Sequence, residues 1–130
     1  YYTNTEKNCI YRMNVFTAKI DVLTGQASMS GAGHLDGKLA QAQFNSPRCM
    51  VKDSEGNLYV ADSGNHCIRK INLKTGFVST VAGLPQQAGY VNGTSETAKF
   101  NKPMGLCIDK DDILYVGDSE NHAIRRVAIE

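Results

Sequence analysis

The sequence lacks the features that mark membrane-spanning and strongly charged proteins. It contains no run of about 18 apolar residues, which excludes a transmembrane helix of ordinary length. The 14 Lys and Arg residues nearly balance the 13 Asp and Glu residues, and no block of five or six like charges occurs. A general nucleic-acid surface is therefore not expected, and neither is membrane insertion or an anionic-membrane surface.

Closely spaced cysteines are also missing. The four cysteines, at positions 9, 49, 67 and 107, form no CxxC pair, so a zinc site of the usual spacing is not expected. We expect free thiols, with disulfides as the alternative, because a free cysteine behaves as a small hydrophobic residue. The sequence leaves the compartment open, and we incline toward an intracellular one.

The length of the chain limits its organisation. A chain of 130 residues and 14.2 kDa suffices for one domain with a core but not for two, which excludes a two-domain enzyme. The chain opens at Tyr1 without an initiator Met or a charged-then-apolar leader. We therefore expect a processed chain or a fragment of a longer protein.

Internal repetition is the main feature that the sequence does contain. The segment 45–71 recurs as 101–127 at an offset of 56 residues and without a gap. A third and more degenerate copy, 1–25, aligns with 59–83 at an offset of 58. Repetition at a fixed period is typical of solenoids and propellers.

Each repeat unit is expected to form four short strands separated by turns. In the complete unit these strands are predicted at about 48–53, 57–62, 67–73 and 77–83. Pro47 and Pro103 precede the first strand of their units, where a missing N–H costs no ladder bond. Brief helices are expected only between the units, around 39–44 and 96–100.

The repeating strands predict an all-β fold, a β-propeller fragment of four-stranded antiparallel blades. The first two strands of each unit are apolar on both faces and must be covered on both sides, as stacked blades would cover them. A sandwich is the alternative, but it needs no such repeat. The predicted domain spans 1–130, with blade segments 1–25 (second to fourth strands), 48–83 (all four) and 104–130 (first to third), and with connections 26–47 and 84–103.

The repeated segments resemble a known family, the NHL repeats. The resemblance rests on Leu58-Tyr59-Val60-Ala61-Asp62-Ser63-Gly64-Asn65-His66-Cys67-Ile68-Arg69 and on Leu114-Tyr115-Val116-Gly117-Asp118-Ser119-Glu120-Asn121-His122-Ala123-Ile124-Arg125. It implies a β-propeller, commonly of six blades. The chain holds about two and a half blades, whereas a closed propeller needs at least about four. We therefore expect the remaining blades to come from further sequence or from other chains.

Polar residues that recur in successive blades are expected to be architectural. Asp62, His66 and Arg69 could be taken for an acid/base triad, but Asp118, His122 and Arg125 repeat them 56 residues later. Two identical catalytic sites in adjacent blades are improbable. We therefore assign a structural role to the set Asp62, Asn65, His66, Arg69, Asp118, Asn121, His122 and Arg125, with no catalytic residue and no metal ligand in this portion.

Residues of the long connections are the candidates for binding, because loops vary without disturbing the sheets. They are His34, Lys38, Gln41 and Gln43 in the first connection, and Gln86, Gln87, Tyr90 and Lys99 in the second. Asn92-Gly93-Thr94 is a glycosylation sequon, which makes Asn92 a candidate site, although Asn-Gly is also turn chemistry.

Three functions remain open on these grounds. The resemblance most often implies a protein-interaction scaffold that binds through its rim loops, and we favour this function. The alternative is part of a metal-dependent lyase or hydrolase whose catalytic residues lie in missing blades. RNA binding, known for some NHL proteins, is disfavoured by the balanced charge. No cofactor is expected, and the expected partners are proteins or the remaining blades.

Overall fold

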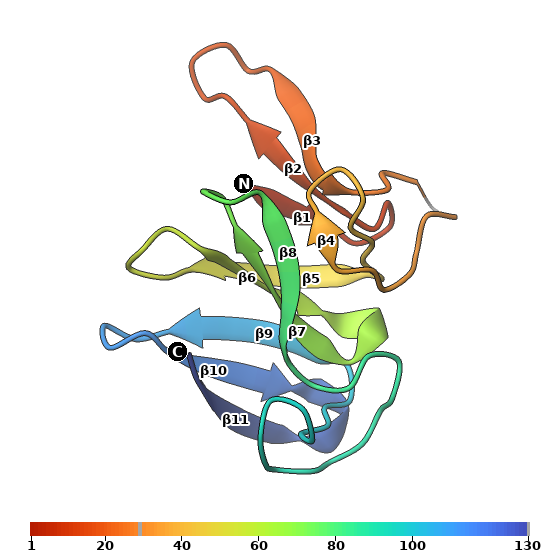
Figure 1. Cartoon of the computed structure of the whole chain (residues 1–130), viewed down its shortest axis with the longest axis vertical. Coiled ribbons are helices and arrows are strands. Elements are labelled where there is room, and N and C mark those ends of the chain that lie inside the picture. Colours follow the sequence, from red (N-terminus) through yellow and green to blue (C-terminus); the bar gives the residue numbers. More distant parts are fainter. Residues whose placement is uncertain (29, 130) are drawn as a thin grey trace.

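The chain folds into three antiparallel sheets that stack side by side (Figure 1). The computed structural model describes residues 1–28 and 30–129. Blade 1 contains β1 (Tyr2–Asn4), β2 (Cys9–Met13) and β3 (Ile20–Gly25). Blade 2 contains β5 (Pro47–Lys52), β6 (Leu58–Asp62), β7 (Cys67–Asn72) and β8 (Phe77–Ala82), and blade 3 contains β9 (Pro103–Ile108), β10 (Ile113–Asp118) and β11 (Ala123–Ala128). The prediction of an all-β propeller fragment is confirmed.

Apolar side chains fill both spaces between the blades. Within blade 2, Val60 and Ile71 join the cluster that faces blade 1, whereas Tyr59 and Ala61 join the cluster shared with Leu114 of blade 3. Successive residues of a strand point to opposite faces of its sheet. All five residues of β6 are buried because both of its faces are covered.

A short strand that the repeat pattern did not predict lies in the first connection. Strand β4 (Gly37–Lys38) pairs antiparallel with β8 and gives the sheet of blade 2 a fifth strand. The connection that enters blade 2 therefore folds back over the outer edge of that same blade. Two residues are too few to give an alternation pattern, and their pairing depends on contacts distant in sequence.

The predicted helices around 39–44 and 96–100 are wrong. Each segment makes only a single turn. In the first turn the Ala42 amide donates a hydrogen bond to the Lys38 carbonyl, and in the second the Ala98 amide donates to the Thr94 carbonyl. Neither turn can continue, because the following residue pairs with an earlier residue of its own connection in the bridges Leu35–Gln43 and Val91–Lys99.

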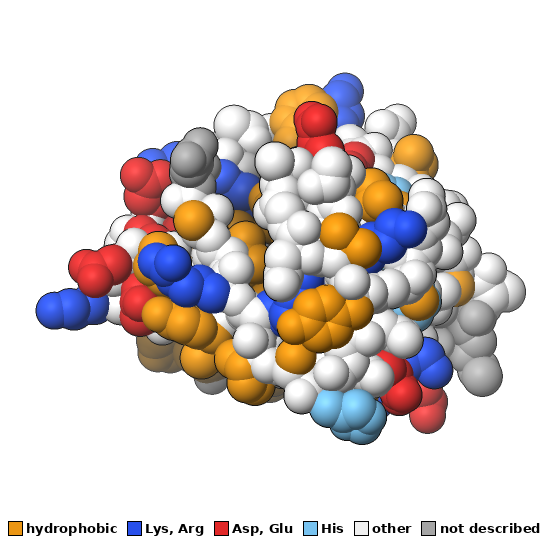
Figure 2. Space-filling view, turned by 90° about the horizontal axis from the view of Figure 1, so that it is seen from below, with side chains coloured by type: hydrophobic (Ala, Val, Ile, Leu, Met, Phe, Trp, Pro, Cys, Tyr) orange, Lys and Arg blue, Asp and Glu red, His pale blue; other side chains and the backbone are white. Residues whose placement is uncertain are grey.

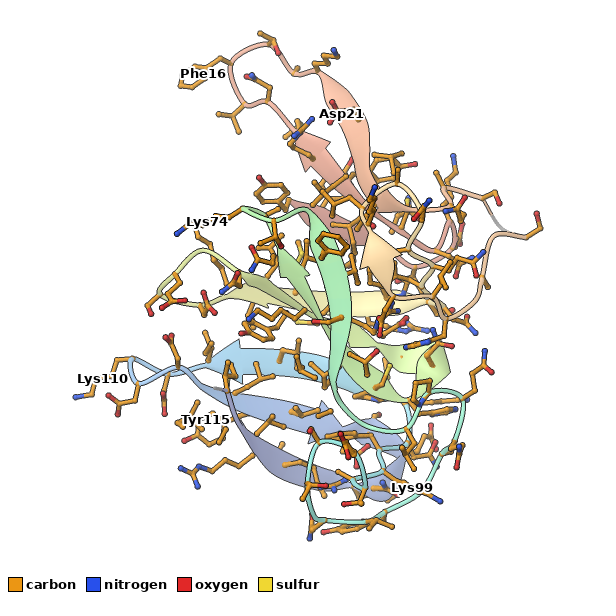
Figure 3. All side chains as sticks on the ribbon, in the orientation of Figure 1. Phe16, Asp21, Lys74, Lys99, Lys110 and Tyr115 are labelled. Carbon is orange, nitrogen blue, oxygen red and sulfur yellow. The ribbon has the colours of Figure 1, made fainter. Side chains whose placement is uncertain are left out.

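The two rims of the blades are different (Figure 1). One rim, called here the connection rim, holds the two long connections together with the 3-10 turns η1 (Ser63–Asn65) and η2 (Ser119–Asn121). The Gly64 amide bonds the Asn45 carbonyl, and the Glu120 amide bonds the Asn101 carbonyl. The opposite rim, called here the hairpin rim, holds the tight hairpin turns, and Figure 3 shows Lys74 and Lys110 at two of their tips.

The described residues contain no helix that is long and apolar enough to span a membrane. The four cysteines are free thiols, with Cys9 and Cys67 buried and Cys107 exposed. Burial raises the pKa of the Cys67 thiol. This thiol therefore acts as a packing group at neutral pH.

Candidate functional site

The best-built polar site lies at the connection rim and is centred on a buried arginine. The Arg69 side chain is fully buried. Its Nε and Nη2 groups donate to Asp36 Oδ1 at 3.1 and 2.8 Å, and its Nη1 group donates to Asp62 Oδ2 at 2.7 Å. One guanidinium is therefore held between two carboxylates, of which Asp62 is completely buried.

The same guanidinium fixes the backbone of the first connection. Its Nη1 donates to the Gln43 carbonyl at 2.8 Å and its Nη2 to the Leu35 carbonyl at 2.9 Å. The Phe44 ring lies beneath the guanidinium, 4.5 Å from Cζ to the ring centroid. The guanidinium thus makes five hydrogen bonds, two to Asp36 and one each to Asp62, Gln43 and Leu35, which use all five N–H donors of an arginine. We call this arrangement of Arg69, Asp36, Asp62, Leu35 and Gln43 the Arg69 clasp.

Asp62 connects the Arg69 clasp to the start of blade 2. Its Oδ1 accepts the Asn45 amide at 2.8 Å, and its Oδ2 accepts from Asn65 Nδ2 at 2.8 Å. The same Asn65 nitrogen also donates to the Gly33 carbonyl at 2.8 Å. Burial raises the pKa of Asp62, while the charge of Arg69 and these hydrogen bonds act in the opposite direction.

Blade 3 carries an equivalent clasp with one exchanged group. Arg125 Nη1 donates to Asp118 Oδ2 at 2.6 Å and to the Lys99 carbonyl at 2.9 Å. Arg125 Nη2 donates to the Val91 carbonyl at 2.8 Å. Arg125 Nε donates to Asn92 Oδ1 at 3.1 Å, so a neutral amide stands where blade 2 has Asp36. The Arg125 clasp therefore contains one carboxylate and the Arg69 clasp contains two.

Aromatic and imidazole rings distinguish the two clasps further. The Arg125 guanidinium lies between the rings of Tyr90 and Phe100, with 4.7 Å from Cζ to each centroid. At the position equivalent to Tyr90, His34 forms a 2.8 Å hydrogen bond between Nε2 and Thr80 Oγ1. Burial lowers the pKa of His34, with a further lowering by Arg69 that Asp36 opposes.

The two clasps show that the connections belong to the repeat. Segments 33–47 and 89–103 follow the same path. In the first segment Asn65 and Arg69 bond the carbonyls of residues 33 and 43, and in the second segment Asn121 and Arg125 bond the equivalent carbonyls of residues 89 and 99. We predicted binding residues in these connections because loops vary between blades, but their backbone paths are equivalent. The sequence carries a signal for this likeness, because the offset of 56 residues continues without a gap back to Gly33 and Gly89.

The binding candidates of the connections divide into supporting and exposed residues. Gln43 and Lys99 contribute carbonyls to the clasps, and His34 is half-buried. The exposed candidates are Lys38, Gln41, Gln86, Gln87 and Tyr90. Asn92 is exposed, and its side-chain oxygen bonds Arg125. Glycosylation there stays a prediction.

The remaining signature residues lie at the 3-10 turns. His66 and His122 end η1 and η2 in the left-handed conformation, with φ of 58° and 53°. His66 Nδ1 accepts the Lys102 amide at 3.0 Å. This bond joins blade 2 to the entrance of blade 3. Arg69, by contrast, binds the connection that enters its own blade, a role that spacing alone did not identify.

A groove of about 950 Å³ runs along β11. It is lined by Tyr90 and Phe100 from the second connection, by β11 from Ile124 onward, and by Thr80 to Ala82 of β8. In blade 2 the equivalent edge of β7 is paired with β8. Figure 2 views the molecule from below and shows hydrophobic and positively charged side chains interspersed on that side.

The acidic and imidazole side chains of the blades are arranged for structural bonds. Within residues 1–28 and 30–129, no group of three or more His, Cys, Asp and Glu side chains is placed to hold a metal ion. Asp53 and Asp109 directly follow the first strands of blades 2 and 3. They bond the backbone of their hairpin turns and accept from the hydroxyls of Tyr59 and Tyr115.

Comparison with known families finds one repeated sequence in blades 2 and 3. The NHL repeat model matches residues 44–71 and 100–127. The chain belongs to the NHL-repeat family. This NHL chain is 36% identical over 100 residues to NHL repeat-containing protein 2 of Bos taurus, covering 75% of the chain and 14% of that protein. It is 29% identical to the chloroplastic protein SUPPRESSOR OF QUENCHING 1 of Arabidopsis thaliana, covering 98% of the chain and 12% of that protein.

Solved structures resemble the NHL chain over nearly its whole length. A structural genomics protein of unknown function from Bacteroides thetaiotaomicron matches with a TM-score of 0.91 and 29% identity, covering 98% of this chain and 32% of that one. An auxiliary nutrient binding protein from Bacteroides ovatus matches with a TM-score of 0.80 and 32% identity, covering 97% and 33%. The chain thus spans about a third of these structures.

Proposed function

We propose that this NHL chain forms part of a larger propeller that acts as a protein-interaction scaffold and binds its partners through the connection rim. The observation that carries the proposal is the pair of arginine clasps. Each clasp fixes the backbone of a rim loop at two carbonyls, while the side chains that the loops present differ from blade to blade.

Fixed loops favour binding for an energetic reason. A loop that is already ordered loses less conformational entropy when a partner binds, so more of the contact energy appears as affinity. The clasp arginines are buried, and the loop carbonyls that they bond are the same whatever side chains the loop tips carry. Substitutions at those tips can therefore change specificity without changing the loop conformation.

The tips carry side chains suited to protein contacts. Tyr90 is 55% exposed, Leu35 is 47% exposed and Val91 is 41% exposed. Aromatic side chains are enriched among the residues that dominate binding energy at protein interfaces. Tyr90 also rests on the Arg125 guanidinium, which limits its rotamers before binding. We expect Tyr90 to be the main anchor of the rim.

The open face of blade 3 supports the proposed larger propeller. Ile68 of blade 2 is completely buried, whereas Ile124, its equivalent in blade 3, is 78% exposed. A further blade packed against β10 and β11 would cover Ile124 as blade 3 covers Ile68. The blade segments 1–25, 48–83 and 104–130 are then consecutive members of one ring.

Site-specific photocrosslinking of the intact protein tests the binding rim. A photoreactive phenylalanine analogue at Tyr90 samples the connection rim, and the same analogue at Lys74 samples the hairpin rim as the matched control. Any crosslinked protein is then purified, and its affinity is measured for the wild type, Tyr90→Phe and Tyr90→Ala. We expect crosslinks from position 90, little effect of Tyr90→Phe, and about a 10-fold or greater loss for Tyr90→Ala. Crosslinks from position 74 alone, or equal affinities for all three proteins, would contradict the proposal.

Small-molecule binding is the second candidate, because solved structures at 32% and 29% identity are named auxiliary nutrient binding proteins. It predicts that defined small solutes raise the melting temperature of the intact protein without any protein partner. A solute that does so equally in wild type and Tyr90→Ala would favour this candidate over the protein scaffold.

A further inference from the structure

Both junctions between blades contain a hydrogen bond from a backbone amide to a side chain, and the side chain that accepts it differs between the two junctions. Between blades 2 and 3, His66 Nδ1 accepts the Lys102 amide at 3.0 Å. Between blades 1 and 2, Asn8 Oδ1 accepts the Ser46 amide at 2.8 Å. Asn8 and His66 occupy the same position of the repeat, at the end of the turn between the second and third strands. An imidazole therefore replaces an amide in an otherwise equivalent contact.

Both partners of this bond have an uncommon backbone conformation. The acceptors Asn8 and His66 have φ of 57° and 58°, and the donors Ser46 and Lys102 have φ of 53° and 52°. Residues other than glycine rarely adopt this left-handed conformation. Each donor directly precedes a proline, Pro47 or Pro103, that begins the first strand of the next blade. The bond thus fixes the point where the chain enters each new blade.

The protonation state of the imidazole decides whether the His66 bond can form. The donor is a backbone N–H, so Nδ1 must carry a lone pair, which only the neutral ring with its proton on Nε2 provides. When Nδ1 binds a proton, two N–H groups face each other and the bond is lost. The side-chain oxygen of Asn8 has no such titration between pH 5 and 8.

The surroundings of His66 favour the neutral ring. Burial lowers the pKa of His66, and the nearby Lys102 ammonium lowers it further, while Asp118 of blade 3 acts in the opposite direction. A histidine with a lowered folded-state pKa stabilises the fold above the unfolded value of about 6.5, and this contribution is lost as the pH falls below it.

We propose that the hydrogen bond from the Lys102 amide to His66 Nδ1 makes the junction between blades 2 and 3 a pH-sensitive contact, whereas the Asn8 junction is insensitive to pH. Acidification opens this bond and leaves the Lys102 amide without its acceptor, while the bonds of Asn101 and the Arg125 clasp still hold the rest of the second connection. The inference does not rest on the proposed function, because it concerns the coupling of two blades whatever the rim binds.

Amide hydrogen exchange in the intact protein, measured by NMR from about pH 8 to about pH 5, tests the proposal. Exchange of the Lys102 and Ser46 amides is divided by the intrinsic rate at each pH to give protection factors. We expect the protection of Lys102 to fall by about 2- to 10-fold, the equivalent of one net hydrogen bond, with a midpoint that coincides with the titration of the His66 ring. The protection of Ser46 stays constant.

Exchanging the two acceptors provides matched controls. His66→Asn installs the acceptor of the first junction and should keep Lys102 protected over the whole range. Asn8→His should make the Ser46 amide pH-sensitive. Asparagine tolerates the left-handed conformation better than most residues, so His66→Asn should fold. The proposal is overturned if Lys102 protection does not change with pH in the wild type, or if its pH dependence persists in His66→Asn.

Discussion

Replacing Arg69 by methionine tests whether the Arg69 clasp stabilises blade 2. Methionine retains much of the apolar stem of arginine but removes the guanidinium that bonds Asp62, Asp36 and two carbonyls. Asp62 is completely buried and would keep an uncompensated charge. Breaking a buried ion pair in this way costs about 3–5 kcal/mol of unfolding free energy. The second carboxylate, Asp36, is 40% exposed and can be rehydrated, so it adds little.

The pH dependence of the Arg69→Met variant provides a second and independent signature. Without Arg69, burial raises the pKa of Asp62 further above its value in the unfolded chain. A raised folded-state pKa means that the folded variant binds a proton more tightly than the unfolded chain. Its stability deficit is therefore smallest at low pH and grows as the pH rises through the pKa of Asp62.

Urea denaturation of the intact protein measures both effects, because the unfolding free energy is obtained by linear extrapolation. Asp36→Asn is the matched control, since Asn92 already fills this position in the Arg125 clasp, and it should cost less than about 1 kcal/mol. Adding Asp62→Asn to Arg69→Met should recover part of the loss, because the neutral amide removes the buried charge. The reasoning is refuted if Arg69→Met costs less than about 1 kcal/mol, or if the double variant is no more stable than the single one.

Three further predictions follow from the turns. Gly83→Ala should lower the free energy of unfolding in urea by more than about 1 kcal/mol, because Gly83 has a φ of +94° and a Cβ there would lie 2.6 Å from the His66 carbonyl oxygen. Gly76→Ala is the control and should be tolerated, since Ala18 holds the equivalent position in blade 1. Equal losses for the two variants would contradict this difference. Tyr59→Phe should cost about 1.5–3 kcal/mol by loss of its buried bond to Asp53, and thermal unfolding that shows no loss of stability would count against it. Burial raises the pKa of Asp53, but hydrogen bonds from Asn57, Tyr59 and Glu55 outweigh burial and hold this pKa below its ordinary value. The pKa of Asp109 is likewise lowered, mainly by the hydrogen bond from the Ile113 amide. Both carboxylates should stabilise the fold above about pH 4 and lose this effect as the pH falls, and an NMR titration that gives ordinary aspartate values would refute the assignment.

The strands of the propeller could be predicted from the sequence because two independent patterns agree there. The repeat of 45–71 as 101–127, together with the third copy 1–25, sets the number of units. Apolar residues on both faces of strands such as β6 require cover on both sides. Turn residues such as Gly56 and Asn57 then separate the strands. These signals are local, so they place every end of β5 to β8 to within one residue.

The candidate site could be predicted only in part, because its bonds join residues that are distant in sequence. The recurrence of Asp62, Asn65 and Arg69 indicated an architectural role, but nothing local connects Arg69 to Leu35, 34 residues earlier. The five donors of a guanidinium can accept many sets of partners, and only the folded path of the connection selects one. For the same reason the brief helices expected at 39–44 and 96–100 are single turns, ended by the Leu35–Gln43 and Val91–Lys99 bridges.

The reactivity of Cys107 tests most directly the central claim that these blades belong to a larger propeller. Cys107 pairs with Tyr115 as Val51 pairs with Tyr59, and Val51 packs between blades 2 and 3. In the chain described here Cys107 is exposed. Thiol labelling of the intact native protein, mapped by mass spectrometry, should leave Cys107 unmodified until the protein is unfolded, because the next blade covers it. Modification of Cys107 in the native protein at the rate of a free surface thiol would contradict the account.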